Sequence, residues 1–313
     1  MTRVTVLEID GCMASSAAMS YEVLATANRV GAGTGVAPFE VTRVRCGPRR
    51  GRADPEAADL VIVPGLGMSV VDDLPGTLAS AACRRACDLL VRAFSGGAML
   101  AASCASTFVL AEAGLLGGRR ATTTWWLAPQ FRRRYPDVEL LTEQIVVADW
   151  PIATGGAAMA HMDLMLAIVA RFATAGTARA TAGFLLLDER RSQATSMALT
   201  YLAGQDPAIA RAETWVRQNI GRRFSMEEVA ASVALGPRTF ARRLAATCGL
   251  SPIQFVHRIR LETAQSLLAS TRLSMDQVAH SVGYAEPSTL RRLIRRDARS
   301  MPGSVRNSRA PSA

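Results

Sequence analysis

One cysteine in the N-terminal half stands where several enzymes hold a nucleophile. The segment AMLAAS (98–103) has the composition of a buried strand, and Ala105 to Glu112 has helical spacing, so Cys104 lies on the turn between them. A helix that starts behind a thiol favours the thiolate, which is its nucleophilic form. A working cysteine nucleophile also needs a base, usually a histidine.

Histidine is scarce in this chain. Of His161, His257 and His280, only His161 belongs to the N-terminal half. A Cys104–His161 dyad and a redox-sensing Cys104 are both conceivable, but a single histidine at a helix start is more often structural, and no second cysteine is adjacent. We therefore expect Cys104 to line a ligand pocket without catalysing. The expected wall of that pocket is Gly65, Leu66, Gly67, Ser103, Cys104, Ala105, Thr124, Trp125, Gly155, Gly156 and His161.

Arginines in an internal repeat form the second group with chemical potential. Residues 224–252 align with residues 273–302. Each copy opens with a serine followed three residues later by Glu or Gln, the signature of a capping box. In each copy a turn and then a second helix should follow. We place the start of that helix at Pro237 or Pro287, since proline suits the first helical turn. The pattern predicts two helix-turn-helix units.

The second helix of each unit should turn its arginines outward. Phe240 and Leu244 in copy one, and Leu290 and Ile294 in copy two, are four residues apart and should face inward. A recognition helix presents such outward residues to the major groove, where arginine can bind guanine through two hydrogen bonds. The alternative is an ordinary solvated basic face. Residues expected near bases are Arg238, Arg242, Ser288, Arg291 and Arg292, and residues expected at phosphates are Arg243, Arg295 and Arg296; Ala241 should also face outward on the DNA-binding side.

Charge and periodicity divide the chain in the same way. The net charge of +10 is concentrated in residues 206–313, which hold 17 arginines and 8 acids, whereas residues 1–205 hold 19 arginines and 18 acids. A basic domain of this size suggests nucleic acid, here double-stranded DNA. The first part alternates short apolar runs with helical runs. We therefore expect an α/β sandwich, flavodoxin-like with a mostly parallel sheet, followed by an all-α domain with two helix-turn-helix units.

Several classes of protein are disfavoured by the sequence. The N-terminus lacks the layout of a signal peptide, and no run reaches the roughly 18 apolar residues of a membrane span. We expect a cytoplasmic protein with no membrane partner. The six cysteines form no CxxC pair, and Cys83 with Cys87 makes a poor zinc site. No metal and no cofactor are expected.

The basic part resembles the AraC/XylS-type DNA-binding domain. The matching segments are FSMEEVAASVALGPRTFARRL, RLETAQSLL and LSMDQVAHSVGYAEPSTLRRLIRR. The first part resembles the ThiJ/PfpI-like domain, a relative of class I glutamine amidotransferases, through DLVIVPG, AASCASTFVLAEAGLLGGRRATTTW and TGGAAMAHMDLMLAIV. The two domains together are similar to the GlxA-type regulators. The implied boundaries are 1–190 for a sensing or dimerisation domain, 191–206 for a linker, 207–306 for the DNA-binding domain and 307–313 for a disordered tail.

The resemblance also bears on Cys104. Related enzymes have a histidine in a TTHW-like motif after the cysteine, and this chain reads TTTW with Thr124 in that place. The resemblance therefore implies a non-enzyme, a transcriptional regulator whose first domain senses a metabolite or dimerises. Trp125 and Trp126 could attract an amino acid, amine or betaine, although large aromatic side chains more often fill core and interface. Expected partners are DNA, that effector, a second copy in a homodimer, and RNA polymerase if the protein activates. The alternatives are a cysteine-dependent hydrolase or amidase using Cys104, and a regulator without a ligand.

Overall fold

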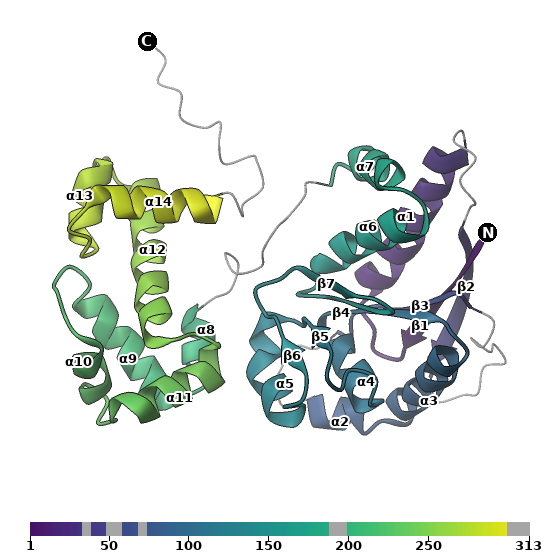
Figure 1. Ribbon diagram of the computed structural model, residues 1–313, viewed down its shortest axis with the longest axis horizontal. Helices are drawn as coiled ribbons and strands as arrows, with labels where there is room; N and C mark the ends of the chain where they lie inside the picture. The colour runs from purple at the N-terminus through teal and green to yellow at the C-terminus, as the bar shows by residue number, and fades with distance from the viewer. Residues whose placement is uncertain (33–38, 48–57, 68–73, 188–198, 299–313) are drawn as a thin grey trace, which may run out of the picture. The chain divides into compact units, whose positions relative to one another are not determined.

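The apolar runs of the N-terminal half form one sheet with helices on both faces (Figure 1). The computed structural model describes residues 1–32, 39–47, 58–67, 74–187 and 199–298. The strands of this sheet are β1 (Thr2–Ile9), β2 (Phe39–Cys46), β3 (Leu60–Val63), β4 (Met99–Ser103), β7 (Val146–Asp149) and β8 (Ile152–Gly155). Their order is β2-β1-β3-β4-β8-β7, and every neighbouring pair is parallel except β7 with β8. The predicted flavodoxin-like sandwich is confirmed.

Alternating side chains of the strands build a core on each face of the sheet, as the two-residue period of a strand requires. Val4 and Ile62 pack beneath α1 (Ala14–Gly31), α6 (Ala160–Phe172) and α7 (Ala175–Phe184). On the other face, Leu7 and Val61 pack against a second group of helices. These are α2 (Leu74–Leu78), α3 (Ala81–Ser95), α4 (Thr107–Glu112) and α5 (Ala128–Arg134). Beside them lie η4 (Cys104–Ser106), η5 (Trp125–Leu127) and a small sheet of β5 (Arg120–Ala121) with β6 (Glu139–Leu140).

The C-terminal half is helical, and two helix-turn-helix units occur in it as the repeat predicts. Its helices are α8 (Leu199–Ala203), α9 (Pro207–Gln218), α10 (Met226–Ala231), α11 (Pro237–Cys248), α12 (Pro252–Ser270), α13 (Met275–Ser281) and α14 (Pro287–Ala298). The first unit is α10 with α11, the second is α13 with α14, and α12 connects them. None of the helices described is long and apolar enough to cross a membrane.

The helix caps differ in part from the prediction. Ser274 and Gln277 form the complete capping box at α13. At α10 only half of it forms: the Ser225 side chain accepts from the Glu228 backbone, but the Glu228 carboxylate pairs with Arg222 at 3.0 Å. An ion pair with a neighbouring arginine has thus replaced the return hydrogen bond.

Part of the segment predicted as linker is helical. The described residues form two compact units, 1–187 and 199–298. Within the segment expected to be linker, α8 buries Leu199, Leu202 and Ala203 and contacts α9 and α11. Five residues are too few to show a helical period, and the residues around them are polar. For these two reasons the sequence did not predict this helix. The remainder of the expected linker (191–198) and the expected tail (307–313) lie outside the described residues.

Candidate functional site

Cys104 lies on a strained turn at the carboxyl end of β4. Its φ is +56°, a left-handed conformation that costs a residue with a side chain about 1–3 kcal/mol. Backbone contacts hold it there: its N–H donates to the Gly156 carbonyl at 2.9 Å, and its own carbonyl accepts from the Thr123 hydroxyl at 2.7 Å. The predicted sharp turn is therefore present.

Segments that are distant in sequence meet around this turn. A side chain on Gly65 would come within 3.2 Å of Cys104 Cβ, and one on Gly155 would come within 3.3 Å of Ser103 Cβ, so glycine allows close approach at both places. The Gly65 N–H donates to the Ser16 hydroxyl at 3.0 Å. The group lies at the carboxyl ends of β3, β4 and β8, the edge where open α/β sheets bind ligands.

The thiol itself is poorly suited to nucleophilic attack. Cys104 is 5% exposed, and burial raises the pKa of its thiol above the usual value. The Ala105 N–H and the Thr124 hydroxyl oppose that rise, but Thr124 Oγ1 has no hydrogen-bond partner of normal geometry among the described residues. Threonine cannot accept the thiol proton at neutral pH. The Thr124 hydroxyl beside the thiol therefore supplies no base to it.

His161 does not act as a base for Cys104, because both of its ring nitrogens are engaged elsewhere. Nε2 lies 2.8 Å from the Ser20 hydroxyl, and Nδ1 lies 2.9 Å from the Ser103 hydroxyl. The ring is 1% exposed, and burial lowers the pKa of His161 to about 4. It is a neutral structural histidine that ties α1 and β4 to α6.

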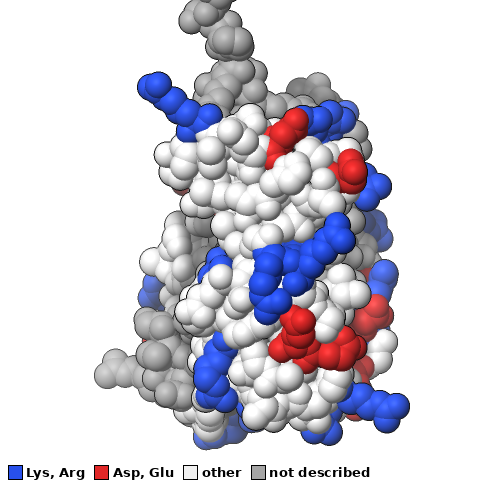
Figure 2. All heavy atoms as spheres, turned by 90° about the vertical axis from the view of Figure 1, so that its left-hand side faces the viewer, with Lys and Arg blue, Asp and Glu red and all other residues white. Residues whose placement is uncertain are grey.

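The predicted recognition helices, α11 and α14, bury one side and expose their arginines on the other. Phe240, Leu244 and Leu290 are buried. Exposed side chains on these helices are Arg238, Arg242, Ser288, Arg291, Arg292 and Arg295, while Ala241 and Arg243 are half-buried. In Figure 2 basic side chains are scattered over the face shown, with acidic side chains grouped between them. The side chain of Arg296 lies outside the described residues.

Two of these arginines already have carboxylate partners. Arg243 Nε and Nη2 donate to the two oxygens of Asp206 at 2.8 and 2.6 Å, a bidentate pair. Asp206 also caps α9 by accepting from the backbone of Ala208, so it joins the two helices. Arg291 donates to Asp276 at 2.6 Å, but both of these side chains are exposed. Arg238, Arg242, Arg292 and Arg295 show no such pair within the part of the chain described.

Comparison with known proteins identifies both halves of the chain. The DJ-1/PfpI family model matches residues 33–171, and a helix-turn-helix domain model matches residues 229–308. The HTH-type transcriptional regulator ArgR of Pseudomonas aeruginosa is 28% identical over 192 residues, 60% of this chain and 58% of that protein. The regulator GlxA of Rhizobium meliloti is 27% identical over 202 residues, 64% of this chain and 62% of that protein. A Streptomyces lividans protein named as an AraC-like transcription regulator is 33% identical over 118 residues, 38% of either chain.

The first half of the chain is thus similar to the DJ-1/PfpI family and the second half to helix-turn-helix domains; the two halves are called the DJ-1/PfpI domain and the helix-turn-helix domain below. It aligns with about three fifths of the length of ArgR and of GlxA, at 58% and 62%. Cys104 and its neighbours belong to the DJ-1/PfpI domain, and the exposed arginines belong to the helix-turn-helix domain.

In the DJ-1/PfpI domain, the structure brings most of the predicted pocket residues together at one edge of the sheet. Gly65, Ser103, Cys104, Gly155 and Gly156 are joined by the contacts described above. Leu66 and Ala105 are buried beside them, and Gly67 is exposed. Among the described residues no group of three or more His, Cys, Asp and Glu side chains could hold a metal ion.

Sequence reasoning missed the serines that support this site. Ser20 holds the His161 ring, and Ser16 holds Gly65. The available signal was their helical spacing: Ser16 and Ser20 are four residues apart and both lie on the buried face of α1, which Ser15 does not share. Ser15 is exposed, since α1 turns it to solvent.

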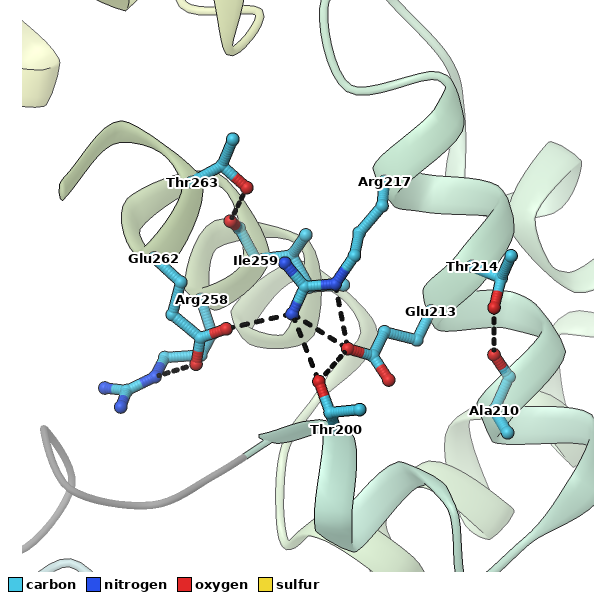
Figure 3. A network of polar contacts seen from close by, with 9 residues as sticks. All are labelled: Thr200, Ala210, Glu213, Thr214, Arg217, Arg258, Ile259, Glu262 and Thr263. Carbon is cyan, nitrogen blue, oxygen red and sulfur yellow. Dashed lines mark hydrogen bonds and ion pairs between the residues drawn. The ribbon is translucent and has the colours of Figure 1, made fainter. Parts of the chain in front are cut away.

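In the helix-turn-helix domain, a polar network holds α8 against the neighbouring helices (Figure 3). The Thr200 hydroxyl donates to the Glu213 carboxylate at 2.6 Å, and Arg217 bridges Glu213 at 2.8 Å and Glu262 at 3.0 Å. Arg258 also pairs with Glu262, at 3.0 Å. The network therefore connects α8 and α9 to α12.

Proposed function

We propose that this chain is a sequence-specific, DNA-binding transcriptional regulator. The observation that carries the proposal is the equivalence of Arg242 and Arg292. Each is the sixth residue of the second helix in its unit, counted from Pro237 or Pro287, and each is exposed with no carboxylate partner within the part of the chain described. Regulators named among the relatives support the same reading.

The proposal is tested by selecting preferred duplexes from a random pool with the full chain. Arg242→Ala and Arg292→Ala should each lose about 1–3 kcal/mol of binding, each at a base pair in a different half of the selected site. Arg272→Ala is the control, because Arg272 is exposed on the loop before α13 and belongs to neither recognition helix. Equal binding of all duplexes, or unchanged base preference in both variants, contradicts the proposal.

The DJ-1/PfpI domain is, in our proposal, a sensing or dimerising domain without catalysis. The raised pKa of Cys104, the threonine at position 124 and the two serine contacts of His161 support this. A cysteine hydrolase would require a base that these residues do not supply. Cysteine-dependent turnover, lost in Cys104→Ala, would overturn this part of the proposal.

The proposed effector is an amino acid, amine or betaine that binds beside Cys104 and Trp125. Thermal unfolding of the full chain against these classes, repeated on Cys104→Leu, tests it, because a ligand bound only by the folded state raises the midpoint. A homodimer and, for an activator, contact with RNA polymerase complete the proposal. Sedimentation of the full chain tests the dimer.

A further inference from the structure

The loop that precedes the first helix-turn-helix unit lies against the second unit. Ile220 in this loop packs into the apolar core of the second unit, against residues that include Val278 and Leu290. A side chain on Gly221 would come within 3.1 Å of the Ser281 carbonyl. The backbone of the loop thus lies against the end of α13.

The turn of the second unit requires a glycine where it meets this loop. Gly283 has φ +80°, and a side chain there would lie 2.5 Å from the Ile220 carbonyl and 2.8 Å from Arg260 Nη2. The contact leaves no room for even a methyl group. Arg260, on the connecting helix α12, is therefore enclosed by parts of both units.

Arg260 is sandwiched between two aromatic rings, one from each side of this junction. Its guanidinium carbon is 5.3 Å from the ring centre of Phe224, which precedes the first unit, and 5.5 Å from that of Tyr284, in the turn of the second. Both distances are within the range of cation–π attraction. A planar guanidinium can stack on rings in this way, whereas the ammonium group of lysine cannot.

The stack is extended at both ends by further ring contacts. Arg222 lies over Phe224 on the first side, at 5.9 Å, and over Trp215 of α9, at 5.1 Å. On the second side, His257 of α12 stacks on Tyr284 with ring centres 6.0 Å apart. An alternating series of rings and arginines thus crosses the junction from α9 to the turn between α13 and α14.

Arg260 has no partner that would explain it as an ion-pairing residue. It forms no salt bridge within the described parts of the chain, and its buried Nε has no hydrogen-bond partner there. Burial lowers the pKa of its guanidinium, in agreement with the lack of a nearby carboxylate. The rings of Phe224 and Tyr284 are thus its main contacts.

We propose that Arg260 is a positioning residue for DNA reading: its stack between Phe224 and Tyr284 fixes the separation and angle of the two recognition helices, α11 and α14. The inference rests on the proposed function. A protein whose two recognition helices are held in this way should bind tightly to only one spacing of the two half-sites in DNA. Inserting one base pair rotates the second half-site by about 35° and moves it by about 3.4 Å. A rigid pair of helices cannot follow that displacement.

The test uses the full chain and the duplex that the wild type selects from a random pool. One base pair is inserted between the two half-sites, and affinities are compared for the wild type and Arg260→Gln. The wild type should lose at least tenfold on insertion, and Arg260→Gln no more than about threefold, because its units can adjust separately. Binding to a duplex with only the first half-site should be equal in both proteins.

Arg272→Gln is the matched control, since it removes the same charge from an exposed position and should keep the full insertion penalty. Phe224→Leu removes a ring but keeps an apolar side chain, and it should relax the spacing as Arg260→Gln does. If Arg260→Gln shows no cooperative unfolding transition and is therefore not folded, Phe224→Leu tests the inference in its place. An unchanged insertion penalty in these variants, or a proportionate loss of half-site binding, overturns the inference. A wild type that selects no sequence would instead overturn the proposed function, and this inference with it.

Discussion

At the scale of single residues, His161 shows how a histidine beside Cys104 can be unavailable for chemistry. The Ser20 hydroxyl donates to the Ser16 carbonyl at 3.1 Å, so it must accept from His161 Nε2–H. Nδ1 is then left to accept from the Ser103 hydroxyl. One neutral tautomer satisfies all of these groups, and a protonated ring would be a buried cation. The arrangement therefore selects neutral imidazole.

His161 should make the fold sensitive to acid in a defined pH window. Its pKa is about 4 in the folded chain and about 6.5 unfolded, so only the unfolded chain takes up this proton between those values. The resulting stability is complete above pH 6.5 and lost as the pH falls to about 4, to a total of about 3 kcal/mol. Proton NMR can check this directly, because the chain has three imidazoles.

One imidazole resonance should titrate near pH 4 and be missing from His161→Gln, whereas His280→Gln should keep it. His280 is exposed on α13 and serves as the control. If the His161 resonance titrates between pH 6 and 7 in the folded chain, the ring is open to solvent and this account of the site is wrong.

At the scale of elements, α8 matters because it is the first helix after the segment that joins the two domains. It is five residues long, too short to be stable alone, so its packing on α9 and α11 must hold it. The Glu213 carboxylate, 5% exposed, receives the Thr200 hydroxyl of α8 and the Arg217 guanidinium of its own helix (Figure 3). The buried Glu213 carboxylate, which accepts from two donors, thus ties α8 to α9 at the start of the helix-turn-helix domain.

Arg217→Met should destabilise the packing of α8 on α9, because it leaves the buried Glu213 carboxylate without its cation. Removing one member of a buried ion pair costs several kcal/mol, but Arg217 is 36% exposed, so we expect about 1–3 kcal/mol. Hydrogen exchange should accelerate in peptides from α8 and α9. Adding Glu213→Leu should restore most of the protection, because no buried charge then remains unpaired.

Arg211→Met is the control for this prediction, since Arg211 is exposed on the same helix. Equal exchange in Arg211→Met and Arg217→Met would show that the network does not anchor α8.

The fold of both domains could be predicted from sequence, whereas several contacts of the site could not. Apolar alternation, the glycines after strands and the internal repeat are local patterns, and they suffice for the sandwich and for the two helix-turn-helix units. The roles of Ser20, Asp206 and Arg260 depend on residues 141, 37 and 24 positions away. Such pairings depend on how elements pack, so no local pattern reports them. Arg243 is an example: helical spacing predicts that it faces solvent, but Asp206 at the start of α9 lies close enough to form an ion pair with it.

At the scale of the whole molecule, the excess positive charge is concentrated in the second domain. Residues 206–313 carry 17 arginines against 8 acids, while residues 1–205 are nearly balanced. Under the proposed function, phosphate contacts by such a basic domain would release counterions, so the affinity for any DNA should fall with salt. Contacts to base edges add preference for a sequence on top of that general attraction. The number of phosphate contacts can therefore be measured from the salt dependence alone.

Arg295 and Arg243 should respond differently to that measurement. Arg295→Ala should lower the slope of log affinity against log salt by about 1 and weaken selected and random duplexes equally, since Arg295 is exposed and has no carboxylate partner in the described part of α14. Arg243→Ala should leave the slope unchanged, because Asp206 already binds Nε and Nη2 of its guanidinium and neutralises its charge, and should instead destabilise the packing of α11 on α9. If Arg243→Ala lowers the slope as much as Arg295→Ala does, the Asp206 pair opens on DNA and Arg243 is a phosphate contact.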